Sequence, residues 1–165
     1  MSEPLTFIFA DDGAIPNSKL PMLVYRDAVP ADPVAIEKLF AANRWPPAWR
    51  ASVHPFQHFH SNAHEALGIA RGRAKVQFGG PAGETLDVQA GDVVVLPAGV
   101  GHCRMDNSAD LLIVGAYPDN TARPDQHRGD PAEHDVVVRN IAAVATPNAD
   151  PVAGGQGPLV RLWRG

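Results

Sequence analysis

The sequence predicts an all-β fold in which short antiparallel strands form a barrel or a sandwich, with one or two short helices at its periphery. The 165-residue chain contains 15 glycines and 16 prolines, so turns divide it into many short elements. Between Ser52 and Pro118, apolar and polar residues mainly alternate with a period of two, which is the pattern of half-buried strands. Short strands separated by turn residues in this way are typical of antiparallel β-barrels and sandwiches.

Residues 1–51 are predicted to hold two strands and one helix. The apolar runs Leu5–Phe9 and Met22–Tyr25 are bounded by turn formers, so both are predicted strands. The segment 32–43 begins with an aspartate that can cap a helix and a proline suited to the first helical position, and its apolar residues recur at helical spacing. Pro46-Pro47 cannot continue that helix.

Residues 52–118 carry most of the predicted strands. Ile69–Phe78 alternates between a small or apolar face and a basic or polar face, which predicts one half-buried strand. Thr85–Gln89 alternates again after a glycine-rich turn. Val93–Leu96 and Leu111–Tyr117 are continuously apolar, as in strands packed on both faces.

Residues 119–165 are predicted to be a loop followed by a segment that packs back on the barrel. The stretch 118–135 is polar and rich in proline, and we expect it to be an exposed loop that places His127 and His134 in solvent. Asp130, with a glutamate three residues later, could cap a helix, but the three valines that follow disfavour one. The apolar segment 159–163 is predicted to cover the barrel, so that the whole chain forms a single domain.

Charge and composition exclude several classes of protein. The formal net charge is −4, from 14 basic and 18 acidic residues, and the basic residues form no block, which argues against nucleic-acid binding. No window approaches the ~20 apolar residues of a membrane helix. The first residues lack a basic region followed by an apolar run, so we expect a cytoplasmic protein. Cys103 is the only cysteine, which rules out an intramolecular disulfide.

A cluster of histidines points to a metal site. His58 and His60 lie at positions i and i+2, so on a strand both rings point to the same side. Glu65 follows a short polar stretch that can turn the chain towards them, and His102 begins a strand after a glycine-rich turn. Three imidazoles and a carboxylate suit Fe(II), Mn, Co, Ni, Cu or Zn. With octahedral coordination, four protein ligands leave two positions for a bidentate substrate, or for a substrate and dioxygen.

The same residues give the chain a resemblance to the cupin family. The chain contains the pattern His58-x-His60-x4-Glu65-x6-Gly72, which resembles the first cupin motif. It also contains Gly91-x5-Pro97-x-Gly99-x2-His102, which resembles the second cupin motif. The chain departs from the family pattern at Ser52, where a glycine is usual, and at Asp106, where an asparagine is usual and Asn107 follows one place later. Neither departure falls on a ligand position.

This resemblance implies a small jelly-roll β-barrel with a divalent metal ion, Fe, Mn, Ni or Zn, held inside by His58, His60, Glu65 and His102. It also implies a homodimer, because small cupins often pair through sheet edges that would otherwise stay exposed. More loosely, four further segments are similar to the uncharacterised YjlB-like bacterial cupins and extend the similarity to nearly the whole chain. These segments are Asp11–Asn17, Trp45–Pro47, Arg128–Pro131 and Asp150–Leu159.

Each candidate residue also has a simpler interpretation. The four candidate ligands could form a hydrogen-bonded cluster without metal, but all four ligand types at the expected spacing favour a metal. His64, in the turn before the carboxylate, is predicted to orient a ligand or line the mouth of the site. His54 either lines the lumen or lies on the surface. Arg104 is predicted to bind a substrate carboxylate, with a salt bridge at the rim as the alternative. Cys103 is predicted to pack as a small hydrophobe facing away from the metal.

The sequence therefore predicts a divalent-metal-dependent enzyme that acts on a small organic molecule. A non-haem dioxygenase and a metal-assisted isomerase or lyase both fit such a site, and Glu65 is expected to act as a ligand that can also move protons. The alternative is a non-catalytic module that binds or senses a metabolite and uses the metal as an anchor.

Overall fold

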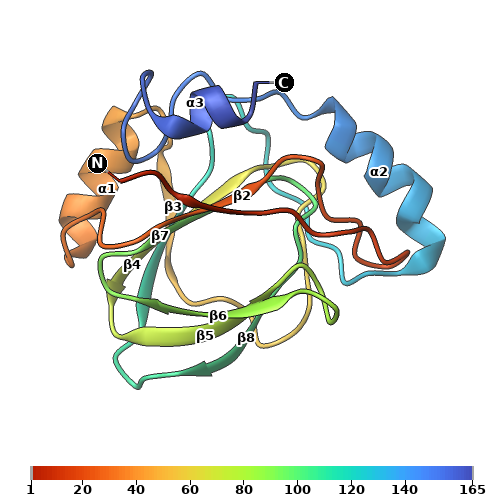
Figure 1. Cartoon of the computed structure of the whole chain (residues 1–165), viewed down its shortest axis with the longest axis horizontal. Coiled ribbons are helices and arrows are strands. Elements are labelled where there is room, and N and C mark those ends of the chain that lie inside the picture. The colour runs from red at the N-terminus through yellow and green to blue at the C-terminus, as the bar shows by residue number, and fades with distance from the viewer. Residues whose placement is uncertain (1, 165) are drawn as a thin grey trace.

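The computed structural model describes residues 2–164, which form nine strands in two antiparallel sheets that face each other (Figure 1). The larger sheet has the order β1-β2-β7-β4-β9-β3, and the smaller one β6-β5-β8. The strands are β1 (Leu5–Phe7), β2 (Met22–Tyr25), β3 (Pro47–Ala51), β4 (Glu65–Arg71), β5 (Arg73–Phe78), β6 (Glu84–Gln89), β7 (Val93–Leu96), β8 (His102–Asn107) and β9 (Leu112–Ala116). The helices are α1 (Pro33–Ala42), α2 (His134–Ala143), α3 (Pro158–Leu162) and the 3₁₀ turn η1 (Pro131–Glu133).

The predicted all-β antiparallel fold is confirmed, and its core lies on both sides of the larger sheet. On β7, Val94 and Leu96 belong to the apolar cluster between the two sheets. Val93 and Val95 belong to a second cluster on the outer face, which α1 and α3 cover (Figure 1). Burial on both faces explains why the sequence of this strand is continuously apolar.

Helix α1 begins where the sequence predicts it. The carboxylate of Asp32 accepts a hydrogen bond from the amide of Ala35 at 2.8 Å, which caps the helix. Ile36 and Phe40 then pack on β4 at Gly68, where an added Cβ would lie 2.6 Å from Ile36 Cγ2. A glycine is therefore needed for the helix to approach the sheet this closely.

The prediction of one strand over Ile69–Phe78 is wrong. This stretch is divided between β4 of the larger sheet and β5 of the smaller sheet, and Gly72 between them has a φ of +71°. The left-handed backbone at Gly72 redirects the chain from one sheet to the other. The predicted alternation holds on β5, whereas β4 is buried on both faces as far as Ala70 because α1 covers it.

Two other N-terminal elements differ from prediction in extent. The first predicted strand, Leu5–Phe9, is shorter in the structure and ends at Phe7. After α1, the proline-rich segment forms β3, which pairs with β9 at the edge of the larger sheet. An edge strand tolerates Pro47 at its first position because no central ladder needs its missing N–H.

Helix α2 forms despite its three valines. Asp130 caps η1 by accepting a backbone hydrogen bond at 2.9 Å, as its sequence context predicts, and α2 continues from that turn. Val137 is buried and packs with Ile15 and Phe59, so tertiary contact outweighs the low helix propensity of a β-branched residue. Among the helices formed by residues 2–164, none has the length and apolarity to cross a membrane.

The C-terminal segment packs on the outer face of the larger sheet, as predicted. Leu159 and Trp163 are buried in the outer cluster. The fully buried carboxylate of Asp150 accepts hydrogen bonds from the amides of Val152 and Leu159 and from the hydroxyl of Tyr25. These bonds attach the C-terminal segment to β2.

The substitution Gly72→Ala tests the role of the sheet crossover. Its added Cβ would lie 2.4 Å from Ser108 Oγ and 2.6 Å from Asp110 Oδ1, in addition to the left-handed backbone strain. We expect the free energy of unfolding, measured by urea denaturation, to fall by about 2–4 kcal/mol. The matched control is Gly13→Ala, which has a φ of +90° but nothing within 4 Å of the added Cβ, and should lose only about 1 kcal/mol. Equal losses in the two variants would contradict this account.

Candidate metal centre

The segment that carries the first two histidines is fixed by backbone hydrogen bonds to two distant parts of the chain. His58 exchanges two such bonds with His102, at 3.2 and 2.9 Å, and Phe59 exchanges two with His127, at 3.0 and 2.9 Å. Because side chains alternate along extended backbone, the rings of His58 and His60 share one side and Phe59 points to the other. Sheet pairing therefore brings His102 beside the two histidines.

Each of the three rings uses its Nδ1 in the same way. Every Nδ1 lies at hydrogen-bond distance from a backbone carbonyl, and since a carbonyl can only accept, Nδ1 must carry the proton. In a neutral imidazole the remaining nitrogen, Nε2, then has a free lone pair. The pairs are His58 with Phe56 at 3.0 Å, His102 with Val100 at 3.0 Å and His60 with Asp125 at 2.5 Å.

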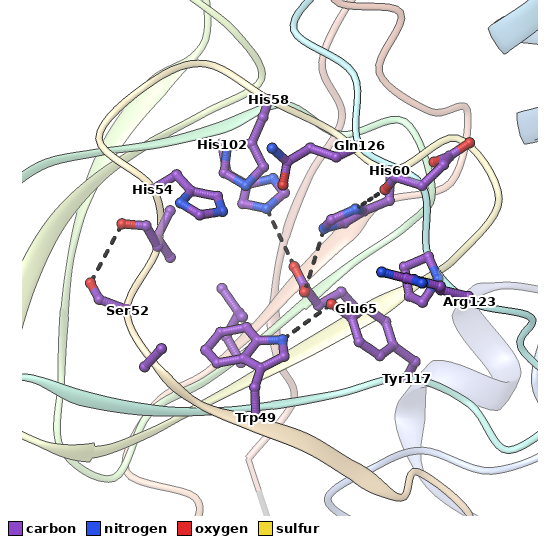
Figure 2. Close-up of a pocket in the computed structure, with 15 residues that line it drawn as sticks. Trp49, Ser52, His54, His58, His60, Glu65, His102, Tyr117, Arg123 and Gln126 are labelled. Carbon is purple, nitrogen blue, oxygen red and sulfur yellow. Dashed lines mark hydrogen bonds and ion pairs between the residues drawn. The ribbon is translucent and has the colours of Figure 1, made fainter.

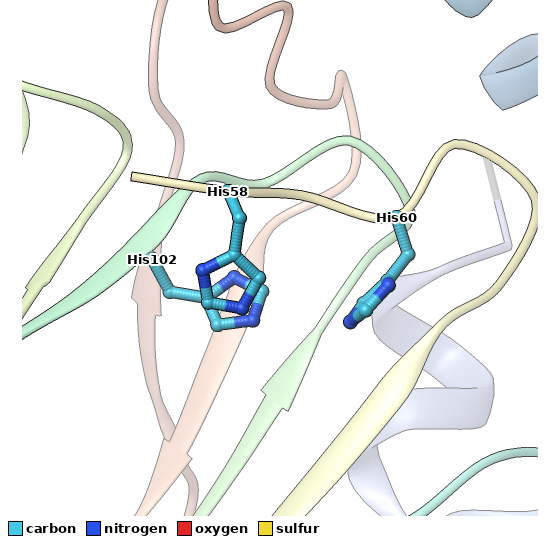
Figure 3. A group of neighbouring side chains, drawn as sticks. All are labelled: His58, His60 and His102. Carbon is cyan, nitrogen blue, oxygen red and sulfur yellow. The ribbon is translucent and has the colours of Figure 1, made fainter. Parts of the chain in front are cut away.

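The three rings converge on one region, as Figure 3 shows. One nitrogen of each ring lies within 4.8 Å of the others. The ring centroids of His58 and His102 are 4.0 Å apart, and that of His60 lies 5.6 Å from the His102 centroid. His58 and His102 are buried, and only 11% of the His60 side chain is exposed. The sequence prediction that these three side chains gather at one point is thus matched by their geometry.

Glu65 is the first residue of β4 and faces the same region. Its Oε1 lies 3.3 Å from Nε2 of His102, and its Oε2 lies 3.5 Å from Nε2 of His60. Burial favours the neutral acid, but hydrogen bonds and positive charge from His102 and His60, which require a proton on Nε2 as well as on Nδ1, outweigh it and hold the pKa of Glu65 well below its usual range. The carboxylate is therefore ionised and aimed at the Nε2 atoms.

The histidines differ in their titration. Burial, with the neighbouring His102, lowers the pKa of His58 to about 3, so this ring is neutral near pH 7. Burial also acts to lower the pKa of His60, but the hydrogen bond and charge of Glu65 outweigh it and raise the pKa overall. A cation bound between Glu65 and His60 would replace the proton that these two groups attract.

The donor set fits a divalent metal ion. Two ligands that each lie about 2.1 Å from one ion are about 3.0–3.5 Å apart at tetrahedral or octahedral angles. The separations of 3.3 and 3.5 Å between Glu65 and the two imidazoles match this spacing. They are longer than an ordinary N–H···O hydrogen bond, which is about 2.7–3.2 Å. His58, His60 and His102, with Glu65, are the residues that would hold the ion.

These groups line a cavity of about 360 Å³, shown in Figure 2. His58, His60 and His102 line it on one side, and Trp49 lies on another. Besides the four candidate ligands, the cavity is lined by Trp49, Ala51, Ser52, Val53, His54, Leu67, Tyr117, Arg123, Pro124, Asp125 and Gln126. The candidate ligands therefore face a space in which a small molecule can lie.

Residues 123–126 form part of this cavity, which the sequence analysis missed. The amide and hydroxyl of Ser61 donate to the carboxylate of Asp125, the amide of Asp125 donates to Asn62, and the Asn62 side chain donates to the carbonyl of Arg123. Burial opposes ionisation of Asp125, but the hydrogen bonds from Ser61 outweigh it and lower its pKa. No periodicity or motif marks these residues, because their role depends on contacts across about 60 residues of chain.

The predicted solvent exposure of His127 is also wrong. Its ring stacks on Phe59, with centroids 5.3 Å apart, and lies 2.8 Å from Glu133 and 3.1 Å from Asp125. His134, from the same predicted loop, begins α2 and lies 2.7 Å from Asp11. Both histidines therefore help to fix the 118–135 segment.

His64 occupies a different environment from the one predicted. Its Nδ1 accepts a hydrogen bond from the amide of Ala98 at 2.9 Å, so its Nε2 carries the proton, which it donates to the carbonyl of Ala145 at 3.2 Å. This is the opposite tautomer to that of the three clustered histidines, and both ring nitrogens are occupied. Burial lowers the pKa of His64 to about 4, and the ring packs on Trp163. His64 supports the fold and does not line the cavity.

The other candidates from the sequence are placed as follows. His54 lines the cavity, with its ring centroid 5.0 Å from that of His58. Arg104 is not among the lining residues, and its guanidinium donates to the carbonyl of Val53 and to Asn107. The position of Arg104 therefore does not support the prediction that it binds a substrate carboxylate. Cys103 is buried outside the cavity lining.

The two facing antiparallel sheets and the histidine cluster between them define a class of protein. Residues 51–139 match the model of the cupin family, and the chain belongs to that family. A curated relative is "Uncharacterized protein YjlB" of Bacillus subtilis (strain 168), which is 40% identical over 162 residues that cover 98% of this chain and 97% of the relative. The resemblance predicted from the two motifs and the four further segments is thereby confirmed.

Solved structures give more distant matches. The 11S allergen of Cocos nucifera is 15% identical with a TM-score of 0.42, over 82% of this chain and 39% of that one. The oxalate decarboxylase of Lactobacillus farciminis is 18% identical with a TM-score of 0.38, over 78% and 32%. A double-stranded β-helix protein of Klebsiella pneumoniae is 16% identical with a TM-score of 0.37, over 78% and 80%. The chain thus spans less than half of the first two proteins.

Metal content tests the candidate centre. We expect protein purified without chelators to contain about one divalent ion per chain, measured by mass spectrometry of the elements. His58→Ala and His102→Ala should each retain less than about one fifth of that content, because each removes a lone pair aimed at the ion. The control is His54→Ala, which removes a ring from the same cavity outside the cluster and should retain the metal. Equal metal content in all of these variants would contradict the assignment.

Proposed function

We propose that this cupin is a metal-dependent enzyme that acts on a small organic molecule, as a non-haem dioxygenase or a metal-assisted isomerase or lyase. The observation that carries the proposal is the common orientation of the three Nδ1–H groups, which leaves three Nε2 lone pairs and the Glu65 carboxylate facing one cavity. A structural zinc site would be closed around its ion, whereas these donors have open space beside them. The arrangement therefore favours a site that admits a further ligand.

The bound ion and the surrounding side chains would have different chemical roles at this site. A divalent ion would supply Lewis acidity and, if it is redox-active, chemistry with dioxygen. Glu65 is ionised and contributes negative charge and a base. Burial, together with the charge of Glu65, raises the pKa of Tyr117 far above its usual range, so its hydroxyl stays protonated. Trp49 donates to that hydroxyl oxygen at 3.1 Å, and the hydroxyl itself is hydrogen-bonded to Glu65, so Tyr117 would donate its proton to an oxygen atom in the cavity by exchanging Glu65 for that acceptor.

Substrate consumption by metal-loaded protein tests the proposal. Iron, manganese, nickel and zinc forms would be screened for oxygen uptake and for conversion of a library of small metabolites. We expect turnover in at least one form, loss of turnover with loss of metal in His60→Ala, and a decrease of about 100-fold in Tyr117→Phe at unchanged metal content, because that variant removes only a proton donor.

Two outcomes would contradict the proposal. If every metal form binds a metabolite but converts none, the protein is a binding or sensing module, which is the alternative function. If turnover persists unchanged in His60→Ala after removal of metal, the chemistry does not take place at this centre.

A further inference from the structure

Arg123 is the cationic side chain that faces the cavity from its mouth (Figure 2). Within residues 2–164, the ion pairs of the arginines and lysines involve Arg26, Arg44, Arg50, Lys75 and Arg161 but not Arg123. The nearest acidic residue in sequence, Asp125, directs its carboxylate to Ser61 and His127. The guanidinium of Arg123 therefore faces the cavity with its charge uncompensated by an ion pair.

The backbone that carries Arg123 is attached to the metal-binding segment. Its carbonyl accepts a hydrogen bond from Asn62 at 3.0 Å, and two residues later the carbonyl of Asp125 accepts the Nδ1–H of His60. Asn62 also accepts from the amide of Asp125 at 2.9 Å. The position of the Arg123 backbone relative to His60 is thus set by hydrogen bonds at Arg123 itself and at Asp125.

The charges of the cavity favour an anion. Three neutral imidazoles and one carboxylate around a divalent ion leave a net charge of about +1 at the centre. Arg123 adds a positive charge and Asp125 a negative one, but the Asp125 carboxylate is held by Ser61 and His127, whereas Arg123 faces the cavity. A guanidinium is also suited to bind a planar carboxylate through two parallel hydrogen bonds. Gln126, on the same segment, adds a neutral amide that can donate to the same group.

The size of the cavity and its apolar lining residues limit the rest of the ligand. About 360 Å³ lies at the lower end of the range for ligand pockets, about 300–1,000 Å³, which favours a small ligand. Trp49, Val53 and Leu67 provide apolar surface. On the basis of the proposed function, we infer that the substrate is a small carboxylic acid with an apolar end, whose carboxylate is bound by Arg123 and which places a second oxygen at the metal.

Binding of a matched pair of probes tests this inference. The acid 3-methyl-2-oxobutanoate and its neutral amide have nearly the same shape, and their affinities for the metal-loaded protein would be measured by calorimetry and, in the cobalt form, by the change in visible absorption. We expect the acid to bind about 10- to 100-fold more tightly than the amide. In Arg123→Gln this preference should disappear at unchanged metal content, and Arg123→Lys should restore part of it.

The matched control is Arg128→Gln. Arg128 lies on the same segment, with its guanidinium 3.6 Å from the centre of the Phe56 ring, and it does not line the cavity. This variant makes the same change in net charge and should keep the full preference for the acid. Two results would overturn the inference about the substrate but not the proposed function. In the first, metal-loaded wild-type protein binds the acid and the amide equally; in the second, the preference for the acid survives in Arg123→Gln. Wild-type protein that takes up no metal would instead overturn the proposed function, and the inference with it.

Discussion

The hydrogen bond from each clustered histidine to a backbone carbonyl is the constraint on which the rest of the site depends. A neutral imidazole has one donor and one acceptor nitrogen, so a carbonyl at Nδ1 fixes the lone pair on Nε2 and also the angle of the ring. The three carbonyls belong to Phe56, Val100 and Asp125, which come from three different segments. The lone pairs converge only when these segments are all in place.

The two sheets contribute different parts of the centre. Glu65 comes from the larger sheet and His102 from the smaller one, and the backbone bridge between His58 and His102 holds the third segment against the smaller sheet. Gly72 determines this arrangement because it sends the chain from one sheet to the other directly after β4. Backbone partners also fix the tautomer of His64. There they select the opposite tautomer and leave no lone pair for a metal.

The sequence predicted the parts that depend on local pattern. The spacing of His58 and His60, and the motif around His102, identified the side chains that the structure brings together, because parity on extended backbone is a local property. The strand break at Gly72 was missed because alternation continues through it, and only its φ shows the change of sheet. The roles of Asp125 and Arg123 could not be predicted, since their segment is polar and proline-rich like any exposed loop, and its contacts with residues 60–62 are long-range. The position of Arg104 two residues after His102, and the affinity of a guanidinium for carboxylates, predict a role in substrate binding, but its donors are used within the protein.

The crystal structure of the metal-loaded protein, with the ion located by its anomalous scattering, is the most direct test of this metal centre. We expect one ion bound through Nε2 of His58, His60 and His102, with each Nδ1 still at hydrogen-bond distance from its carbonyl. An ion bound through Nδ1 of a flipped ring, or at a place remote from the three imidazoles, would contradict this expectation.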